Sequence, residues 1–177
     1  NCILGDPGTY IYHCNIQKRD EYRRSCNHNT VWTKDQEQSQ MMGAFLWGKK
    51  AGTKLLKSDL TENQDSLLAE CVWQNGNKHS RSFCFNKADK LVIEDDMEAT
   101  TDSYATLVLH PACQVKVENG KTVIQRGAIT VCIEANIEPT IEKCWYSEEY
   151  GKEKETHKLC YPLNDNKLKT TIWIEKY

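Results

Sequence analysis

Long apolar segments are missing from this chain of 177 residues, and so are large apolar side chains such as Phe and Met, with 3 of each. No run approaches the roughly 18 apolar residues that a membrane-spanning helix needs, and the mean hydropathy is −0.69. Charge of one sign is also lacking, because 23 basic residues stand against 25 acidic ones. We therefore expect neither membrane insertion nor nucleic-acid binding driven by counterion release.

Catalytic motifs are missing too. The five histidines are scattered, and none lies in a Gly-x-Ser-x-Gly, His-Glu-x-x-His or papain-like context. No Asn-x-Ser/Thr sequon is present, so N-glycans are not expected. The sequence predicts a protein that is not an enzyme and that needs no cofactor or metal.

Cysteine is what the chain has in excess, with nine residues and no Cys-x-x-Cys pair. Zinc knuckles and thioredoxin-like sites need that close spacing. The nearest metal-like group is His13 and Cys14 with Cys26 and His28, which would use two cysteines where disulfides are favoured. Dispersed cysteines predict a secreted, extracellular, disulfide-stapled protein, and the start at Asn1 suggests that a signal peptide was removed.

Strand signals dominate the local pattern. Residues 114–124 alternate apolar and polar side chains around Asn119 and Gly120, which is typical of a type I′ hairpin. Residues 106–109, 128–133 and 170–174 also read as strands.

Residues 33–70 differ from this pattern. Thr33 with Gln36 and Thr61 with Gln64 resemble helix capping boxes. Two apolar groups recur at helical spacing, namely Met41, Met42 and Phe45, and Leu67, Leu68 and Cys71. We expect a partly helical insertion here.

The cysteines also suggest an internal repeat. Cys2, Cys84 and Cys160 are each followed by an Asp and then by an apolar or aromatic strand pattern. With Trp32 placed after Cys26, and with the segment 126–132 ending in Cys132, the chain resembles complement control protein (sushi) modules. The similarity is to the divergent form that parasitic nematodes secrete as immunomodulators, such as a TGF-β mimic and inhibitors of the alarmin pathway.

This resemblance implies a fold of small disulfide-stapled β modules in tandem, at residues 1–83 and 84–159, followed by a strand or tail at 160–177. The insertion at 33–70 would belong to the first module. The family's pairing, first cysteine to third and second to fourth, would join Cys2–Cys26, Cys14–Cys71, Cys84–Cys132 and Cys113–Cys144, leaving Cys160 over. A shifted frame with Cys71–Cys84 and Cys144–Cys160 as closing pairs stays open.

The resemblance also implies a function, which is to bind a host cytokine or cytokine receptor, with the interleukin-33 receptor pathway favoured, and to block signalling. Trp47 is the first candidate for an interface anchor, because it lies with Phe45 in a glycine-bounded loop. The competing interpretation is that both rings cover a small core. Lys49 and Lys50 would form a solvated basic face together with Lys54 and Lys57, and the alternative interpretation is that this face steers an acidic partner. The alternative function is a lipocalin-like carrier of a small ligand, which requires a barrel of about eight strands.

Overall fold

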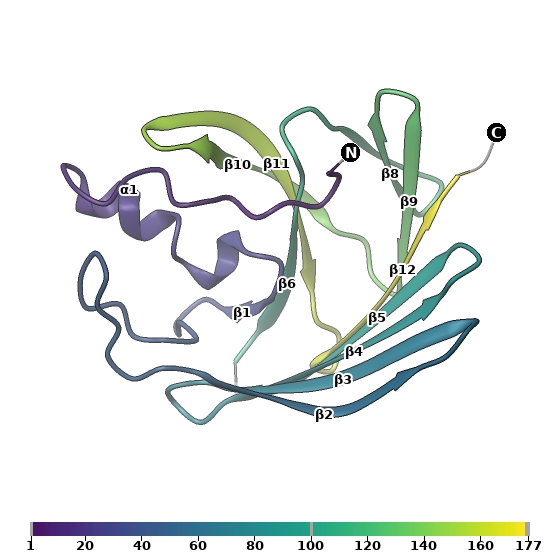
Figure 1. Ribbon diagram of the computed structural model, residues 1–177, viewed down its shortest axis with the longest axis horizontal. Helices are drawn as coiled ribbons and strands as arrows, with labels where there is room; N and C mark the ends of the chain where they lie inside the picture. Colours follow the sequence, from purple (N-terminus) through teal and green to yellow (C-terminus); the bar gives the residue numbers. More distant parts are fainter. Residues whose placement is uncertain (1, 100, 176–177) are drawn as a thin grey trace.

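Strands dominate the computed structural model, which describes residues 2–99 and 101–175 (Figure 1). One α-helix, α1 (Ile16–Glu21), and one 3₁₀ turn, η1 (Ser25–Asn27), precede the strands. The strands in the first half are β1 (Val31–Thr33), β2 (Gly52–Leu60), β3 (Gln64–Val72), β4 (Lys78–Asn86), β5 (Lys90–Glu98) and β6 (Ser103–Val108). Those in the second half are β7 (Gln114–Glu118), β8 (Lys121–Arg126), β9 (Ile129–Ala135), β10 (Thr140–Glu149), β11 (Lys152–Pro162) and β12 (Lys167–Ile174). Neither helical segment in the described part of the chain has the length and apolar character to cross a membrane.

The strands form two antiparallel sheets that pack as a β-sandwich (Figure 1). The smaller sheet has the order β1-β6-β11-β10, and the larger one has the order β2-β3-β4-β5-β12-β9-β8-β7. β5 pairs with β12, and β12 pairs with β9, so the C-terminal strand lies in the middle of the larger sheet. The chain cannot complete this sheet until its last strand is in place.

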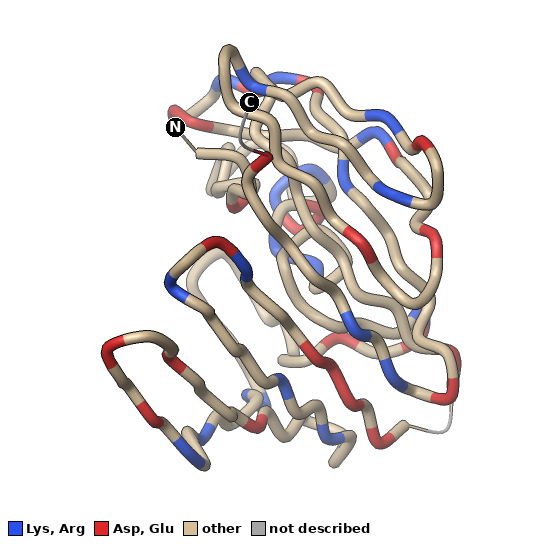
Figure 2. The backbone as a smooth tube through the Cα atoms, turned by 90° about the vertical axis from the view of Figure 1, so that its right-hand side faces the viewer, with Lys and Arg blue, Asp and Glu red and all other residues tan. Residues whose placement is uncertain are grey.

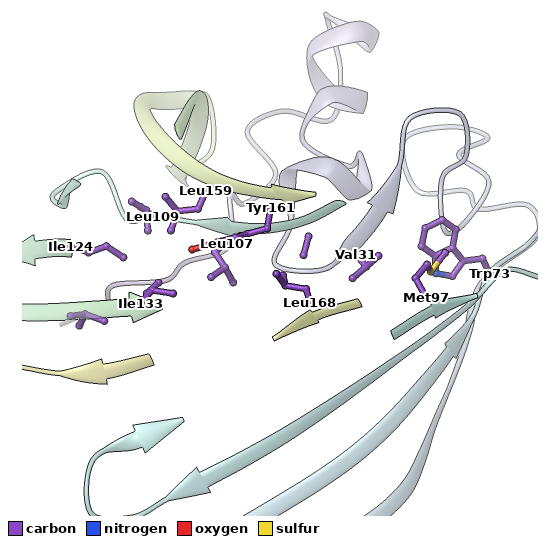
Figure 3. Close-up of a cluster of buried hydrophobic side chains, with 12 residues drawn as sticks. Val31, Trp73, Met97, Leu107, Leu109, Ile124, Ile133, Leu159, Tyr161 and Leu168 are labelled. Atoms are coloured by element: carbon purple, nitrogen blue, oxygen red, sulfur yellow. The ribbon is translucent and has the colours of Figure 1, made fainter. Parts of the chain in front are cut away.

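The core lies between the two sheets (Figure 3). Leu107, Leu159 and Tyr161 of the smaller sheet face Ile133 and Leu168 of the larger sheet. β6 is buried at five of its six positions, because it is an inner strand of the smaller sheet and is covered on both sides. This shared apolar layer is the main source of stability that the structure offers.

The predicted hairpin at 114–124 is confirmed. β7 and β8 pair in register around Asn119 and Gly120, whose φ angles are 51° and 73°. A type I′ turn requires positive φ angles at both of these positions, so the local sequence alone was sufficient to predict the turn. The strands predicted near 106–109, 128–133 and 170–174 correspond to β6, β9 and β12.

The predicted helical insertion at 33–70 is wrong. Residues 52–72 form the β2–β3 hairpin, and Leu67, Leu68 and Cys71 lie on β3. Thr61 and Gln64 do exchange hydrogen bonds, with the Gln64 N–H donating to Thr61 Oγ1 at 3.0 Å, but these bonds close the hairpin turn. Pairing of β3 with strands on both sides outweighs the helical spacing of its apolar residues.

The predicted fold class of tandem disulfide-stapled modules is also wrong. All nine cysteines are free thiols. The expected boundary between residues 83 and 84 falls inside β4, and strands from both sides of it share one sheet and one core. The closed barrel that a lipocalin-like carrier requires is replaced by two open sheets.

The geometry shows why one of the expected disulfides cannot form. Cys84 lies on β4 and Cys132 on β9, with β5 and β12 between them. Three strand spacings amount to about 14 Å, whereas the Cα atoms of a disulfide lie within about 7 Å. Burial raises the pKa of Cys144 and of Cys160 to about 11, so both thiols stay protonated. The free thiols remove the disulfide argument for secretion, which stays a prediction.

We expect Leu159→Ala to lower the free energy of unfolding by about 2–5 kcal/mol, because it opens a cavity at a side chain with 0% exposure. Leu60→Ala is the matched control, since Leu60 is 70% exposed, and it should change stability by less than about 0.5 kcal/mol. Urea unfolding measures both variants. Equal losses would contradict this placement of the core.

Candidate functional site

A pocket of about 290 Å³ lies where the segment from α1 to β1 meets the loop that leads to β2. We call it the Arg23–Trp47 pocket. Its lining residues are Arg23, Ser25, His28, Thr30, Glu37, Gln38, Ser39 and Trp47. An aromatic ring, a guanidinium and several hydrogen-bonding side chains meet there, which is the usual composition of a binding site for a polar ligand.

Two larger hollows of about 470 Å³ each have less suitable linings. One of them gathers Asp102, Asp165 and Tyr104 beside the β11–β12 turn. The other lies over β5 and β12, where Lys169 pairs with Glu94 at 2.8 Å. Among the described lining residues of these two hollows, no arginine is present.

Arg23 is the central cation of the pocket. Its guanidinium carbon lies 4.0 Å from the centroid of the Trp47 ring, which is a cation–π contact. Nη1 donates to the Gly43 carbonyl at 2.6 Å and lies 3.5 Å from Asp20 Oδ1. Nη2 is buried and has no hydrogen-bond partner among the described residues. An unused N–H on a fixed guanidinium can bind a carboxylate or sulfate oxygen.

His28 is a second ionisable group in the lining. Its Nδ1 lies 2.7 Å from Asp6 Oδ2, and its Nε2 lies 2.9 Å from the Tyr22 carbonyl. Both neighbours are acceptors, so the geometry suits an imidazolium that donates from both nitrogens. Burial alone would lower the pKa of His28, but the hydrogen bond and charge of Asp6 outweigh it and raise that pKa above its ordinary value.

Asp6 is fixed by the turn in which it lies. Asp6 Oδ1 accepts a hydrogen bond from the Gly8 N–H at 3.0 Å, and the Pro7 carbonyl accepts one from the Ser147 N–H at 2.8 Å. Gly8 has a φ of 80°, and a Cβ atom there would overlap the Ser147 carbonyl oxygen. Glycine is therefore required for this segment to lie against β10 and to present Asp6 to His28.

Glu37, the one carboxylate of the lining, already has partners. Its Oε1 accepts from Arg24 Nε at 3.1 Å and its Oε2 accepts from the Ser25 N–H at 2.8 Å. The charge of Arg24 thus balances Glu37, and Asp6 balances His28 when the imidazole is protonated. Asp20 is shared by Arg19 and Arg23, which leaves an excess of one positive charge on the Arg23 side of the pocket.

A buried ion-pair network contacts the backbone between His28 and Thr30, two residues that line the pocket. Asp95, with 4% exposure, accepts from His79 Nε2 at 2.6 Å and from Arg81 Nε and Nη2 at 2.6 and 3.1 Å. Arg81 Nη1 also donates to the carbonyl of Asn29 at 2.8 Å, and the Asn29 side chain accepts from the Val108 N–H at 2.6 Å. The larger sheet thereby fixes the residue next to His28.

The structure places the sequence-predicted site residues in different surroundings. Trp47 lines the pocket, whereas Phe45 is 70% exposed outside it, and Lys49 and Lys50 are exposed where the loop leads to β2. Whether they bind a partner stays a prediction. The sequence reasoning missed Arg23, although Lys18, Arg19, Arg23 and Arg24 form a local basic cluster that could have indicated it.

From the sequence, His28 is a possible zinc ligand beside Cys26, and Asp6 belongs to the suggested repeat and to a turn signal at residues 5–8. In the described residues, no group of three or more His, Cys, Asp or Glu side chains comes together in a way that could hold a metal ion. The partner that His28 actually contacts, Asp6, is 22 residues away in the sequence and is brought near by the turn at Gly8.

Comparison with known proteins gives the family. The model of the family "Heparinase II/III-like, C-terminal" matches residues 1–175, so the chain belongs to this family. No curated protein matches the chain.

Solved structures share the fold. Heparinase III, the BT4657 gene product, has a TM-score of 0.82 at 17% identity over 98% of this chain. Heparan sulfate lyase HepC from Pedobacter heparinus has a TM-score of 0.81 at 17% identity over 99% of it. This chain spans 28% and 29% of the length of those two proteins.

These findings overturn the resemblance to sushi modules. They also overturn two predicted functions, the block of a cytokine or cytokine receptor and the lipocalin-like carrier. The matching family is heparinase II/III-like, and the two structures named above are a heparinase III and a heparan sulfate lyase. The cysteine spacing that suggested a repeat is distributed over a single pair of sheets.

We expect Asp95→Asn to lower the free energy of unfolding by about 3–5 kcal/mol, because it leaves the Arg81 guanidinium without its counter-charge and disturbs the contact with His79 Nε2. Glu94→Gln on the same strand is the control. It breaks an exposed pair with Lys169, so its effect should stay below about 1 kcal/mol. Urea unfolding measures the free energy of unfolding of both variants. A small effect of Asp95→Asn would contradict a stabilising role of the network.

His28 should make stability depend on pH. Because its pKa is raised on folding, its contribution is complete below the unfolded value of about 6.5 and is lost as pH rises through the higher folded value. We expect the urea midpoint of the wild type to fall across that window, and His28→Gln to remove this part of the fall. His13→Gln, which alters an exposed histidine, should keep the wild-type slope. If the slope persists in His28→Gln, another group causes it.

Proposed function

We propose that this domain binds an anionic polysaccharide of the glycosaminoglycan type, and that the Arg23–Trp47 pocket holds one acidic sugar unit of it. The observation that carries the proposal is the buried, unpartnered Nη2 of Arg23 beside the Trp47 ring. The guanidinium would bind a sulfate or carboxylate, and the ring would shield that contact from water.

The family and the neighbours support this class of ligand. The chain belongs to a heparinase-like family, and one structural neighbour is described as a heparan sulfate lyase. The ligands of heparinases are sulfated and carboxylated chains, which match a guanidinium in charge and shape.

A local site is needed because the molecule as a whole does not attract polyanions. The net charge is −2, and Figure 2 shows acidic and basic residues interspersed along the strands. Many of these charges are paired on the surface, as Lys167 is with Asp96 at 3.4 Å. Binding would therefore depend on a few positioned cations and not on a broad basic face.

We further propose that the domain alone binds the chain without cleaving it. Elimination from a uronic acid unit requires a base with a free lone pair, and both nitrogens of His28 already face acceptors. Burial, together with the hydrogen bond to Glu153, raises the pKa of the nearby Tyr22 far above its ordinary value, so this hydroxyl keeps its proton.

Isothermal titration with a heparan sulfate hexasaccharide tests the pocket. We expect Arg23→Gln to weaken binding about 10- to 100-fold, since a hydrogen bond to a charged group contributes about 1.5–3 kcal/mol. Arg23→Lys should fall between this variant and the wild type, because it keeps the charge and loses the planar fork. Thermal melting would verify that both variants fold.

Lys167→Gln is the matched control, because it removes one exposed positive charge on the outer face of the larger sheet. Its affinity should equal that of the wild type. Equal weakening by Arg23→Gln and Lys167→Gln would contradict a specific pocket. An increase in ultraviolet absorbance from unsaturated uronate during incubation would contradict binding without cleavage.

A further inference from the structure

Three aromatic side chains lie together on the surface close to the Arg23–Trp47 pocket. They are Tyr12, Phe45 and Tyr150, with exposures of 37%, 70% and 62%, and we call them the aromatic platform. The ring centroid of Tyr12 lies 4.8 Å from that of Phe45 and 5.6 Å from that of Tyr150. Exposed rings that touch one another in this way usually mark a binding surface.

The platform is assembled from three separate segments that meet at one end of the molecule (Figure 1). Tyr12 precedes α1, Phe45 lies in the loop before β2, and Tyr150 lies in the turn between β10 and β11. The Gly151 N–H donates to the Tyr10 carbonyl at 2.8 Å, which joins the first segment to the third. The rings are therefore held in place before any ligand arrives.

The loop that carries Phe45 also builds the pocket. The N–H groups of Met42 and Gly43 both donate to the Leu46 carbonyl, at 3.0 and 3.2 Å, which closes a tight turn. Gly43 accepts the hydrogen bond from Arg23, and Trp47, two residues after Phe45, contacts the Arg23 guanidinium. One loop thus contributes Phe45 to the platform and Trp47 to the pocket.

We propose that the aromatic platform is a second subsite, which stacks the C–H face of a sugar unit next to the one held in the Arg23–Trp47 pocket. This inference rests on the proposed function and extends it. The ligand is then an extended anionic polysaccharide of several units, bound through charge at one subsite and through an apolar sugar face at the other.

The chemistry of the platform favours a sugar over a strongly charged group. The ions that flank Tyr150 pair with each other, with Lys152 Nζ at 2.5 Å from Glu149 Oε2. The rings therefore offer apolar and quadrupolar surface without net charge, which suits the weakly polar C–H face of a pyranose. Because Phe45 and Trp47 lie two residues apart in one loop, a single extended ligand is the favoured occupant of both subsites.

Two properties follow that separate the subsites. A short ligand fills the pocket alone, so substitutions on the platform matter only for longer chains. Stacking is insensitive to salt, whereas the contact at Arg23 weakens as salt screens it.

The test is calorimetric titration with size-defined heparan sulfate, a disaccharide and a hexasaccharide, at low and high salt. Phe45→Ala and Tyr150→Ala should each weaken hexasaccharide binding about tenfold, or about 1.4 kcal/mol, at both salt concentrations, and should leave disaccharide binding unchanged. Leu60→Ala is the matched control, since Leu60 is also 70% exposed but ends β2. It should bind like the wild type.

The outcomes distinguish the two proposals. If Arg23→Gln weakens hexasaccharide binding but neither platform variant does, the second subsite is wrong and the proposed function stands. If the wild type binds neither oligosaccharide, both are wrong. If sedimentation shows a dimer of the wild type that Phe45→Ala dissociates, the platform is a contact between copies of this chain, and the inference is overturned.

Discussion

The buried carboxylate of Asp95 is the contact on which the arrangement of the other parts depends. Burial alone would raise its pKa, but the hydrogen bond from His79 and the charge of Arg81 lower it, so it stays ionised inside the sandwich. Arg81 in turn reaches the carbonyl of Asn29. The network in the larger sheet therefore fixes the backbone at Asn29, next to the pocket residues His28 and Thr30.

Around that anchor, the molecule has a frame of two sheets and an end that is built by loops. Two sheets with one apolar core provide the frame. The N-terminal segment, the loop before β2 and the β10–β11 turn gather at one end of it (Figure 1). Loops can specialise for ligands because the sheets behind them already supply the stability. The Arg23–Trp47 pocket and the aromatic platform are both built by these loops.

Some elements of the fold follow from residues that are close together in the sequence, and others do not. The hairpin at Asn119 and Gly120 was predictable, because two positive φ angles and an alternating pattern lie within eleven residues. The prediction of a helical insertion was wrong because Leu67, Leu68 and Cys71 lie on a strand, β3, which pairs with β2 on one side and with β4 on the other. The disulfide pairing predicted from the cysteines was wrong because the spacing of cysteines in the sequence does not specify which strands lie between two thiols.

By itself, the sequence determined the high strand content, the type I′ turn and Trp47 as a residue of interest, since each depends on neighbours within a few positions. Only the tertiary structure decided that Trp47 meets Arg23, that His28 meets Asp6 and that Tyr12, Phe45 and Tyr150 touch. These contacts join residues that are 22 to more than 100 positions apart. The physical reason is that they depend on how the sheets pair and on where the loops meet at the end of the sandwich, neither of which a local pattern specifies.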